Sequence, residues 1–565
     1  MWQDRLKAIV GSGRAAALAL VAAVAVVYLP SLSGGFLIDD DVLLTESRLI
    51  QAPDGIWRFW FSTEAVDYWP LSNSSLWLEW RLWGMRPFGY RVTNVLLHIA
   101  ESLLFWRILR ELAIPGAFLA ALLFAVHPLN VEAVAWIAQR KTLMALLFAQ
   151  LATLAFLRSP AGANNEHNQP WHRDGWYWLA VVAFACAMLS KVSAVVFPVL
   201  LAWVMWWTRS PARPRVAPFA PLFAVAVALL AVNVWFRAHD PNIHVAIDPL
   251  ESALRAPYLL WFYLGKAVLP IDLYFMYDIG RVDPADWRWW IPLLAALATT
   301  AVLLSWRHRR GVLLFAWGYY VLAMLPALGL TEVPFVEDHY QHFALIGVTS
   351  LFAAAWQSQR HRAAPISRRA LEIAAVAVVC ALAVLSWRHA ATFTDNVVLM
   401  RAAVEAAPTA VSHRNLGYVL MRAGRPAEAL PHMEESLRLD PQAVDGHKKI
   451  AIVLAELGDK TRAIQHSQAA LMLSPDDPET LDNLGSLLRE SGRAAEAVPH
   501  FERALSMRPA SVRTRCNLGK SMLELGEVEK AIEQFEHALR IDPRSAEAAR
   551  LLAAARNTPP APPDY

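Results

Sequence analysis

The chain has 565 residues, of which 56% are hydrophobic, and its formal net charge at pH 7 is +3. This apolar composition excludes an ordinary soluble protein, the length allows at least two domains, and the small net charge gives no support to a nucleic-acid-binding role. The three cysteines lie far apart and two fall inside apolar segments, so no disulfide framework is predicted.

Eleven apolar segments are predicted to be the spans of an all-α, polytopic membrane bundle that covers residues 1–390. Some must extend into their flanks, because a helix needs roughly 20 residues to cross a bilayer. The first has a basic flank but no small-residue cleavage site at its end, so we interpret it as a retained span rather than a signal peptide. The segments are 14–30, 92–109, 114–126, 143–157, 176–189, 192–207, 217–236, 289–306, 312–330, 343–356 and 371–387.

Short clusters of basic residues between these segments set the predicted orientation, because cytoplasmic loops are enriched in Lys and Arg. A further apolar run, 257–270, is short and ends in proline. If it crossed, the basic cluster at 307–310 would lie outside, so we predict that it does not cross. The N-terminus is then cytoplasmic and the part after the last span is external. The external segments rich in carboxylates or histidines are 31–90, 127–139, 237–288 and 331–342.

Asp39, Asp40 and Asp41 stand together just after the first span, in the predicted external loop 31–90. Like charges this close raise one another's proton affinity, and the adjacent membrane disfavours ionised groups. Such a cluster is either a well-solvated loop or a site that uses carboxylates. The triplet by itself leaves both interpretations open.

Polar side chains inside the predicted spans are informative, because each is costly unless it faces the bundle interior. Asn94, His98 and Glu101 follow a spacing of four and then three residues, which places them on one helix face. They form either a buried hydrogen-bond network or part of a site. Lys191 interrupts a continuous apolar stretch, which favours a functional interpretation.

A 34-residue period begins near residue 402. It is carried by Gly424, Gly458, Gly492 and Gly526, by Pro441, Pro475, Pro509 and Pro543, and by Ala429, Ala463, Ala497 and Ala531. This is the period of the tetratricopeptide repeat, in which small residues allow close helix packing, glycine permits the turn and proline ends the second helix.

The repeats predict an α-solenoid domain over residues 391–557. An array of this kind is a binding surface without chemistry of its own, or alternatively a structural spacer. The predicted parts are repeats at about 409–441, 442–475, 476–509 and 510–543, a capping helix at 545–556 and a disordered tail at 558–565.

The membrane half also carries a series of motifs in a specific order. They are Phe36–Glu46, Tyr68–Leu71, Pro87–His98, His127–Trp136 with Arg140 and Lys141, Ser190–Lys191, and Tyr263–Lys266 with Pro270 and Leu273. In this order they resemble the bacterial relatives of the transmembrane-and-tetratricopeptide O-mannosyltransferases. Two positions depart from that pattern: Thr142 replaces an aspartate, and His339 replaces the arginine of an Asp-Arg-Tyr motif.

The resemblance implies a glycosyltransferase of the GT-C fold whose donor is a polyprenyl-phosphate sugar. It also implies that Asp39 and Asp40 are the acidic pair of the first external loop, one of them the catalytic base. We expect Asp39 to be the base and Asp40 to raise its proton affinity or position the acceptor. Asp41 falls on a variable position. The resemblance points to metal-free transfer, so we expect no cofactor, although carboxylates can hold a divalent metal.

Candidate residues for binding the substrate or the lipid phosphate come from the same external face. His127 and Glu132 either bind substrate or cap the helix after Pro128, and Asp338 either serves the sugar hydroxyls or is solvated. The full set is Arg140, Lys141, Lys191, Lys266, His339, Asp338, His127, Glu132 and His98.

We therefore predict an inverting enzyme of the bacterial inner membrane that moves a sugar from its polyprenyl-phosphate carrier to Ser/Thr hydroxyls of exported proteins. The periplasmic repeats would recruit the acceptor, so the expected partners are the bilayer, the lipid-linked sugar and an acceptor protein or peptide. Two alternatives stay open: a membrane-anchored repeat scaffold for an envelope assembly, and a GT-C enzyme that acts on a glycan or lipid.

Overall fold

The computed structural model describes residues 13–162, 170–208, 216–239, 248–280, 282–328 and 336–557. The chain divides into two compact units, Met1–Ala402 and Ala403–Tyr565. The described residues form helices and no strand, and their one isolated bridge pairs Tyr277 with Val336. The all-α prediction is thus confirmed, while the predicted tail lies outside the described residues.

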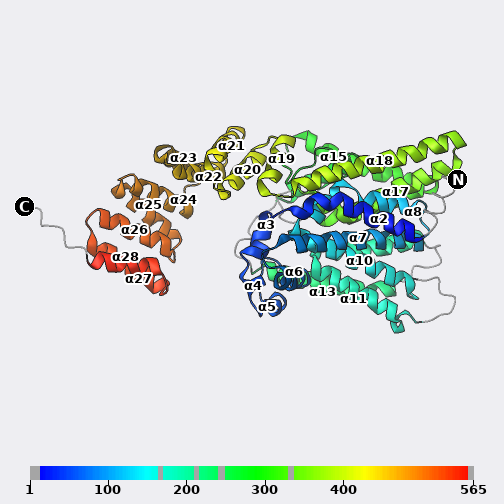
Figure 1. Cartoon of the computed structure of the whole chain (residues 1–565), viewed down its shortest axis with the longest axis horizontal. Helices are drawn as coiled ribbons and strands as arrows, with labels where there is room; N and C mark the ends of the chain where they lie inside the picture. The colour runs from blue at the N-terminus through cyan, green and yellow to red at the C-terminus, as the bar shows by residue number, and fades with distance from the viewer. Residues whose placement is uncertain are drawn as a thin grey trace, which may run out of the picture. The chain divides into compact units, whose positions relative to one another are not determined.

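The first unit is a helical bundle whose longer helices run largely side by side (Figure 1). Its α-helices are α2 (Gly13–Tyr28), α3 (Ile38–Asp40), α4 (Arg48–Gln51), α5 (Gly55–Phe61), α6 (Pro70–Trp83), α7 (Pro87–Glu111), α8 (Ala117–Ala125), α9 (Val131–Ala135), α10 (Arg140–Arg158), α11 (Gly175–Ser190), α12 (Phe197–Thr208), α13 (Ala220–Arg237), α14 (Pro249–Val268), α15 (Trp290–Ser305), α16 (Arg307–Met324), α17 (His342–Arg362) and α18 (Pro365–Thr392), and α19 (Asn396–Ala406) crosses the boundary of the units.

Short 3₁₀ turns and one π-helical turn, η2, connect these helices. They are η1 (Leu29–Ser33), η2 (Asp41–Thr45), η3 (Pro128–Asn130), η4 (Ile137–Gln139), η5 (Trp171–Arg173), η6 (Val192–Val196), η7 (Ala217–Phe219), η8 (Trp287–Trp289), η9 (Leu325–Ala327) and η10 (Asp338–Gln341).

Six helices of the described residues are long and apolar enough to cross a membrane, or seven if α8 and the bent segment after it form one span. The shorter apolar helices are Gly175–Ser190, Val192–Thr208 and Gly311–Ala327. The chain is therefore a multi-pass membrane protein. Every predicted span coincides largely with helix. The exceptions are residues 114–116, 126, 306 and 328, which are not helical, and residues 329 and 330, which lie outside the described residues. The count of eleven stays a prediction, because α17 and the shorter helices do not qualify by length and composition.

The run that we predict not to cross the membrane belongs to α14. This helix contains Pro257, ends at Val268 and is followed by Pro270. An interior proline removes one backbone hydrogen bond. The helix also carries Glu251 and Lys266, and it is not among the described helices that qualify as spans.

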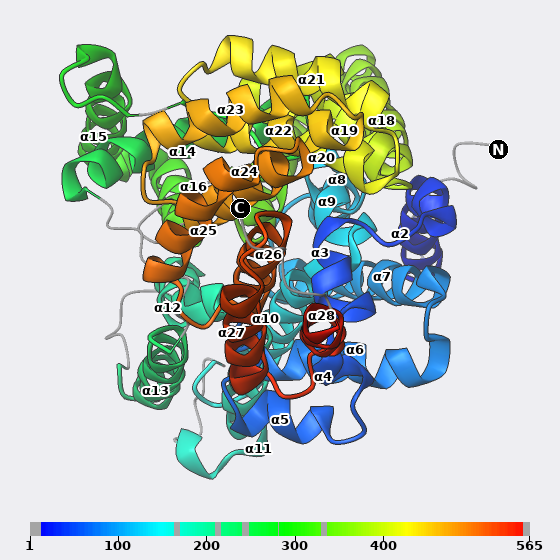
Figure 2. The same ribbon diagram turned by 90° about the vertical axis from the view of Figure 1, so that its left-hand side faces the viewer.

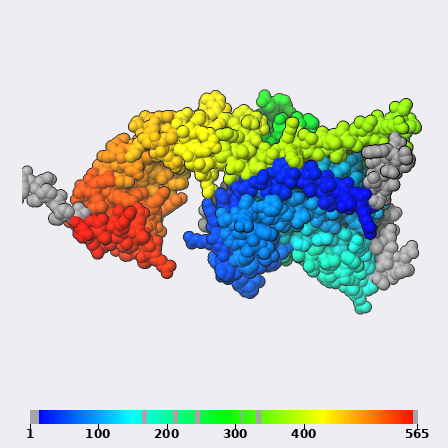
Figure 3. Space-filling view, viewed as in Figure 1, coloured from blue at the N-terminus to red at the C-terminus, as the bar shows by residue number. Residues whose placement is uncertain are grey.

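The packing of the first unit places α2 against α7, α8 and α18, while α10 packs on α7 and α11. The end-on view shows α15 at the margin of the bundle (Figure 2), and none of the residues in its apolar window is buried. An apolar helix without protein cover is expected to face lipid. The space-filling view shows α2 and α18 along one face of the unit (Figure 3).

The second unit consists of helix pairs that fall at the predicted repeats. Gly424 and Gly458 have φ angles of +70° and +84°, which glycine adopts without the steric penalty of other residues. The pairs are α20 (Ala410–Arg422) with α21 (Pro426–Leu439), α22 (Val444–Glu456) with α23 (Lys460–Leu473), α24 (Pro478–Glu490) with α25 (Ala494–Met507), and α26 (Val512–Glu524) with α27 (Val528–Ile541), followed by α28 (Ala546–Arg556).

The first unit continues past residue 390, where the sequence places the domain boundary. The segment after the last span is hydrogen-bonded to the loop of the acid triplet. The Gly35 N–H donates to the Thr394 carbonyl at 2.8 Å, and the Ile38 N–H donates to Asn396 Oδ1 at 2.9 Å. These contacts make residues 391–402 part of the membrane unit.

Gly485 tests the packing of the repeats, because a Cβ there would lie 2.8 Å from the Phe501 ring. We expect Gly485→Leu to lower the free energy of unfolding of a 403–557 fragment by about 1–3 kcal/mol in urea titrations. The control is Gly492→Asn, since this glycine has open space and Asn tolerates its positive φ. Equal effects of the two substitutions would contradict the packing.

Candidate active site

Asp40 holds the loop of the acid triplet in place. Its carboxylate accepts the backbone N–H of Leu37 at 2.9 Å and that of Ala138 at 2.8 Å, so it ties the first loop to the residues before α10. Burial raises the pKa of Asp40 to about 7, against the opposing effects of the Leu37 N–H, the Arg91 guanidinium and the Ala138 N–H. Because Asp40 is fully buried and both its oxygens are bonded, it positions its neighbour and does not meet an acceptor.

Arg91 makes a second tie between the same segments. Its buried guanidinium donates to the carbonyl oxygens of Ser31 at 2.9 Å, Ala135 at 2.7 Å and Gly35 at 2.5 Å. Three carbonyl acceptors from two loops fix the geometry of both, since the guanidinium fork is rigid.

Asp39, in contrast, is exposed. Desolvation by the surrounding protein raises the pKa of the Asp39 carboxyl, and the positive charge of Lys141 opposes that shift. The Lys141 ammonium lies 3.7 Å from the centroid of the Trp69 ring, a cation–π contact that fixes the lysine beside the acid loop. The pair thus offers a proton acceptor and a cation that interact electrostatically.

Lys191 lies in a break between α11 and η6, where its backbone is extended. Its ammonium donates to the Thr142 hydroxyl at 2.9 Å and lies 5.6 Å from the centroid of the Tyr340 ring. Glu337 and Glu132 are its acidic neighbours. Because position 142 carries a threonine, Lys191 meets a hydroxyl there instead of a carboxylate.

Glu132, Glu337, Asp338 and His339 form an acid–histidine cluster next to Lys191. Glu132 accepts the backbone N–H of Asp338 at 3.1 Å and contacts His339 Nδ1, which also lies 3.4 Å from Glu337 Oε2. Burial raises the pKa of Glu337 and of Asp338 and lowers that of His339. Glu132 therefore anchors the late loop, the described residues 336–341 before α17, to α9.

Asp338 is linked in turn to Tyr277, whose hydroxyl donates to it at 2.9 Å. The other Asp338 oxygen, Oδ2, is buried and has no partner among the described residues. Lys266 donates to the carbonyl oxygens of Ile271 and Asp272 and lies 5.3 Å from the centroid of the Tyr277 ring. This lysine thus links the last turn of α14 to the residues that follow it, and it contributes positive charge near Asp338.

Three sequence candidates have structural partners of their own. Arg140 is fully buried, and all three of its guanidinium nitrogens donate, to Asn94, Ser75, Glu79 and the Tyr90 carbonyl. His127 caps η3 by accepting the Leu129 N–H, as one of the two sequence interpretations predicts, and contacts the Ala267 carbonyl. His98 lies in a separate cluster with Glu101 and His342.

Several residues of the site escaped the sequence analysis. Arg237, at the end of α13, lies 3.4 Å from Asp67, which is an acidic neighbour of Lys141 and Lys191. Arg91 had a sequence signal, a charged residue at the start of an apolar helix. Tyr277 and Asp67 had none, because their contacts join segments that are distant in the sequence.

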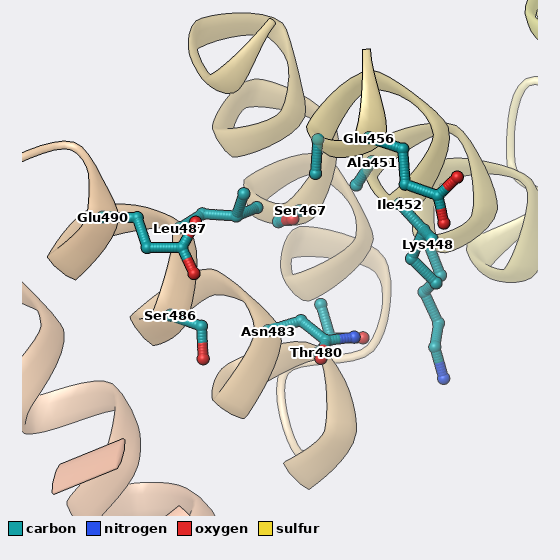
Figure 4. Close-up of a pocket in the computed structure, with 11 residues that line it drawn as sticks. Lys448, Ala451, Ile452, Glu456, Ser467, Thr480, Asn483, Ser486, Leu487 and Glu490 are labelled. Atoms are coloured by element: carbon teal, nitrogen blue, oxygen red, sulfur yellow. The ribbon is translucent and has the colours of Figure 1, made fainter. Parts of the chain in front are cut away.

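The repeat unit has its own pocket, of about 220 Å³, between the first helices of two successive repeats (Figure 4). Lys448 and Ile452 line it from α22, and Asn483, Ser486 and Glu490 line it from α24. It therefore combines one apolar wall with amide, hydroxyl and charged groups.

Protein-family models match segments in both units of the chain. Residues 70–236 match the family model "Dolichyl-phosphate-mannose-protein mannosyltransferase", and residues 414–478 and 488–555 match two tetratricopeptide repeat models. The sequence resemblance to O-mannosyltransferases with repeats is thereby confirmed.

The curated relatives are named protein O-mannosyl-transferases. Protein O-mannosyl-transferase F38B6.6 of Caenorhabditis elegans is 23% identical over 75% of this chain and 62% of its own length. Protein O-mannosyl-transferase TMTC2 of Mus musculus is 32% identical over 30% of this chain and 21% of its own length. The chain thus spans less than two thirds of these relatives.

Among solved structures, MamA 41-end from Desulfovibrio magneticus RS-1 is 27% identical with a TM-score of 0.26, and covers 26% of this chain and 83% of its own. In sequence, the chain is similar to the protein O-mannosyl-transferases, and it combines a multi-pass membrane unit with tetratricopeptide repeats.

Arg140 and its neighbour Lys141 are predicted to respond differently to the loss of charge. Arg140→Met leaves Glu79 buried and unpaired, so we expect it to cost about 3–5 kcal/mol and to lower the unfolding temperature in detergent clearly. Lys141→Met loses a cation–π contact of about 1 kcal/mol and the attraction to the exposed Asp39. If Arg140→Met unfolded at the wild-type temperature, its scaffold role would be refuted.

Proposed function

We propose that this protein is a membrane glycosyltransferase of the GT-C type that transfers a sugar from a polyprenyl-phosphate carrier to Ser/Thr hydroxyls of exported proteins. The observation that carries the proposal is the exposed Asp39 beside Lys141, with Lys191 and its acidic neighbours next to them. An accessible carboxylate with adjoining cations is the set of groups that base-assisted displacement of a phosphate requires.

In the proposed step, the acceptor hydroxyl attacks C1 of the sugar while Asp39 takes its proton. The bond between C1 and the phosphate oxygen breaks, and the lipid phosphate leaves with that electron pair. Lys141 and Lys191 neutralise the phosphate charge. Direct attack inverts the anomeric centre and, as the family resemblance implies, uses no metal at Asp39. Asp40 and Arg91 act by holding Asp39 in position.

The remaining site residues receive supporting roles in this proposal. Glu132 and His339 hold the late loop, and with it Asp338, whose second carboxylate oxygen is buried without a partner among the described residues. Lys266 and Arg237 add positive charge at the margin of the site. Because Arg140 and His127 have structural partners, we no longer assign either of them to the phosphate.

We further propose that the active site faces the periplasm of a bacterium and that the N-terminus is cytoplasmic. The carboxylate-rich loops then receive acceptors on the outer side of the inner membrane, where the lipid-linked sugar is presented. In the repeat unit, the pocket beside Asn483 and Lys448 is the candidate surface for an acceptor segment, because amide and charged groups can bind a peptide backbone and its side chains.

The scaffold alternative explains the ionisable groups less well. A membrane anchor has no need of the buried Glu132 or of a lysine in a helix break, each of which is costly in a bilayer. A glycan or lipid acceptor would leave the repeat pocket without a use in catalysis. Acceptor competition distinguishes these cases, since peptides should inhibit transfer only if the acceptor is a protein.

The first prediction of the proposal concerns its base. We expect Asp39→Asn to lower the rate of sugar transfer by about 10²–10⁴-fold, because the acceptor proton loses its acceptor. Transfer is measured with radiolabelled polyprenyl-phosphate sugar and purified protein in nanodiscs. Asp41→Asn is the matched control and should keep the wild-type rate. A wild-type rate in Asp39→Asn would refute the assignment.

The pH profile provides an independent check. Asp39 must be ionised to act as a base, and its pKa is raised, so kcat/KM should fall as the pH drops through a midpoint above that of an ordinary aspartate. Because Lys141 lowers the pKa of Asp39, Lys141→Met should move this midpoint to higher pH. A midpoint that stays in place, or moves down, would contradict the pairing.

Orientation is tested with reporters fused after Tyr565. Alkaline phosphatase, which is active only outside the cytoplasm, should be active there, and a green fluorescent protein fusion should be dark. The opposite pattern would place the repeats on the cytoplasmic side and would remove their proposed role in recruiting exported acceptors.

A further inference from the structure

A second cluster of ionisable groups lies inside the membrane unit and has no part in the proposed transfer. His98 and Glu101 come from α7, and His342 is the first residue of α17. All three residues are buried, with at most 1% of their surface exposed. His98 Nδ1 and His342 Nε2 each lie 3.2 Å from the same oxygen, Glu101 Oε2.

The opposite edge of each imidazole fixes its tautomer. His98 Nε2 lies 3.1 Å from the Ala125 carbonyl oxygen, which can only accept, so this nitrogen carries a hydrogen. His342 Nδ1 lies 2.7 Å from Asn130 Oδ1. The amide orientation of Asn130 is settled because its Nδ2 donates to the Phe124 carbonyl at 2.7 Å. His342 Nδ1 therefore carries a hydrogen as well.

With the imidazoles neutral, three lone pairs converge on one point. His98 Nδ1 and His342 Nε2 both face Glu101 Oε2 without a hydrogen between them. A single proton on Oε2 satisfies only one of the two contacts. A metal cation satisfies both, and imidazoles whose other N–H is held by an oxygen acceptor are the usual form of histidine ligands.

The distances fit such an ion. Tetrahedral zinc with bonds of about 2.1 Å to nitrogen and oxygen sets its ligand atoms roughly 3.3–3.4 Å apart. Both nitrogen-to-oxygen distances are 3.2 Å, and all three ligand atoms lie within 4.8 Å of one another. Two further polar atoms are buried without a partner among the described residues: Glu101 Oε1 and the Tyr28 hydroxyl. The Tyr28 ring packs edge-on against His98, with ring centroids 5.5 Å apart.

The acid–histidine cluster of the active site provides a contrast. There, His339 Nδ1 contacts Glu132 directly, and the third group of the cluster among the described residues is the carboxylate Glu337, not a second imidazole. A hydrogen on that nitrogen satisfies the contact, so the geometry does not require an ion. Of the two such clusters in the described part of the chain, only that of His98, Glu101 and His342 brings two histidine lone pairs together.

We propose that His98, Glu101 and His342 bind a structural divalent cation, of which zinc best matches two imidazoles and a carboxylate. The ion joins α7 to the start of α17. Because His339 lies three residues before His342, the ion also fixes the late loop of the active site. It takes no part in the transfer step, and the proposal does not depend on the sugar or the acceptor.

The test is the metal content of the full-length protein, purified through a tag without histidines into nanodiscs and measured by mass spectrometry. We expect about one zinc per chain in the wild type and a loss of at least about tenfold in His98→Gln and in His342→Gln. The matched control, His339→Gln, changes a histidine of the neighbouring cluster and should retain its zinc.

A second measurement uses the wild-type protein, so it remains informative if the histidine variants fail to fold. Wild-type protein produced with cobalt should show the visible ligand-field absorption of a nitrogen- and oxygen-ligated ion, and Glu101→Gln should shift or abolish it. A wild type without bound metal would overturn the proposal in favour of a shared-proton network. Zinc retained in the His98→Gln, His342→Gln double variant, or lost in His339→Gln alone, would also overturn it.

Discussion

The buried carboxylate of Asp40 is the contact on which the site depends. It joins two segments nearly a hundred residues apart in the sequence, since it accepts one backbone N–H from its own loop and another from Ala138. Arg91 reinforces the same junction through three carbonyl oxygens. Hydrogen bonds to a buried charged group are strong and expensive to leave unmade, so the loop has one favoured geometry. In that geometry Asp39 is exposed and Lys141 is beside it.

Around this junction, each lysine of the site has acidic neighbours. Lys141 has Asp39 and Asp67 as neighbours, and Lys191 has Glu132 and Glu337. A charge in a membrane bundle is tolerated when an opposite charge or a hydrogen bond compensates it. A lipid phosphate would add negative charge next to lysines that already have acidic partners. Its binding should therefore weaken the pairs between lysine and acid, and loosen the late loop that carries Glu337.

Much of this arrangement was predictable from sequence, for reasons that differ between the parts. The repeats follow from glycine, alanine and proline at a 34-residue period, because each has a local steric cause. Hydropathy located the apolar helices, while the number of spans stays a prediction. The acid loop was recognised from ordered motifs. The roles of the neighbouring cations were not predictable. Arg140 and Lys141 are adjacent in sequence, but Arg140 is fully buried among its hydrogen-bond acceptors and Lys141 lies over the Trp69 ring. Only the folded chain distinguishes such neighbours.

The most direct test of the account is a structure of the protein with polyprenyl phosphate bound in nanodiscs. We predict density for the phosphate within hydrogen-bonding distance of the Lys141 and Lys191 ammonium groups, with Asp39 on the open side of the phosphate and Arg140 still bonded to Glu79. A phosphate held elsewhere, for example by the arginines at the end of α17, with Lys141 and Lys191 unchanged, would contradict it.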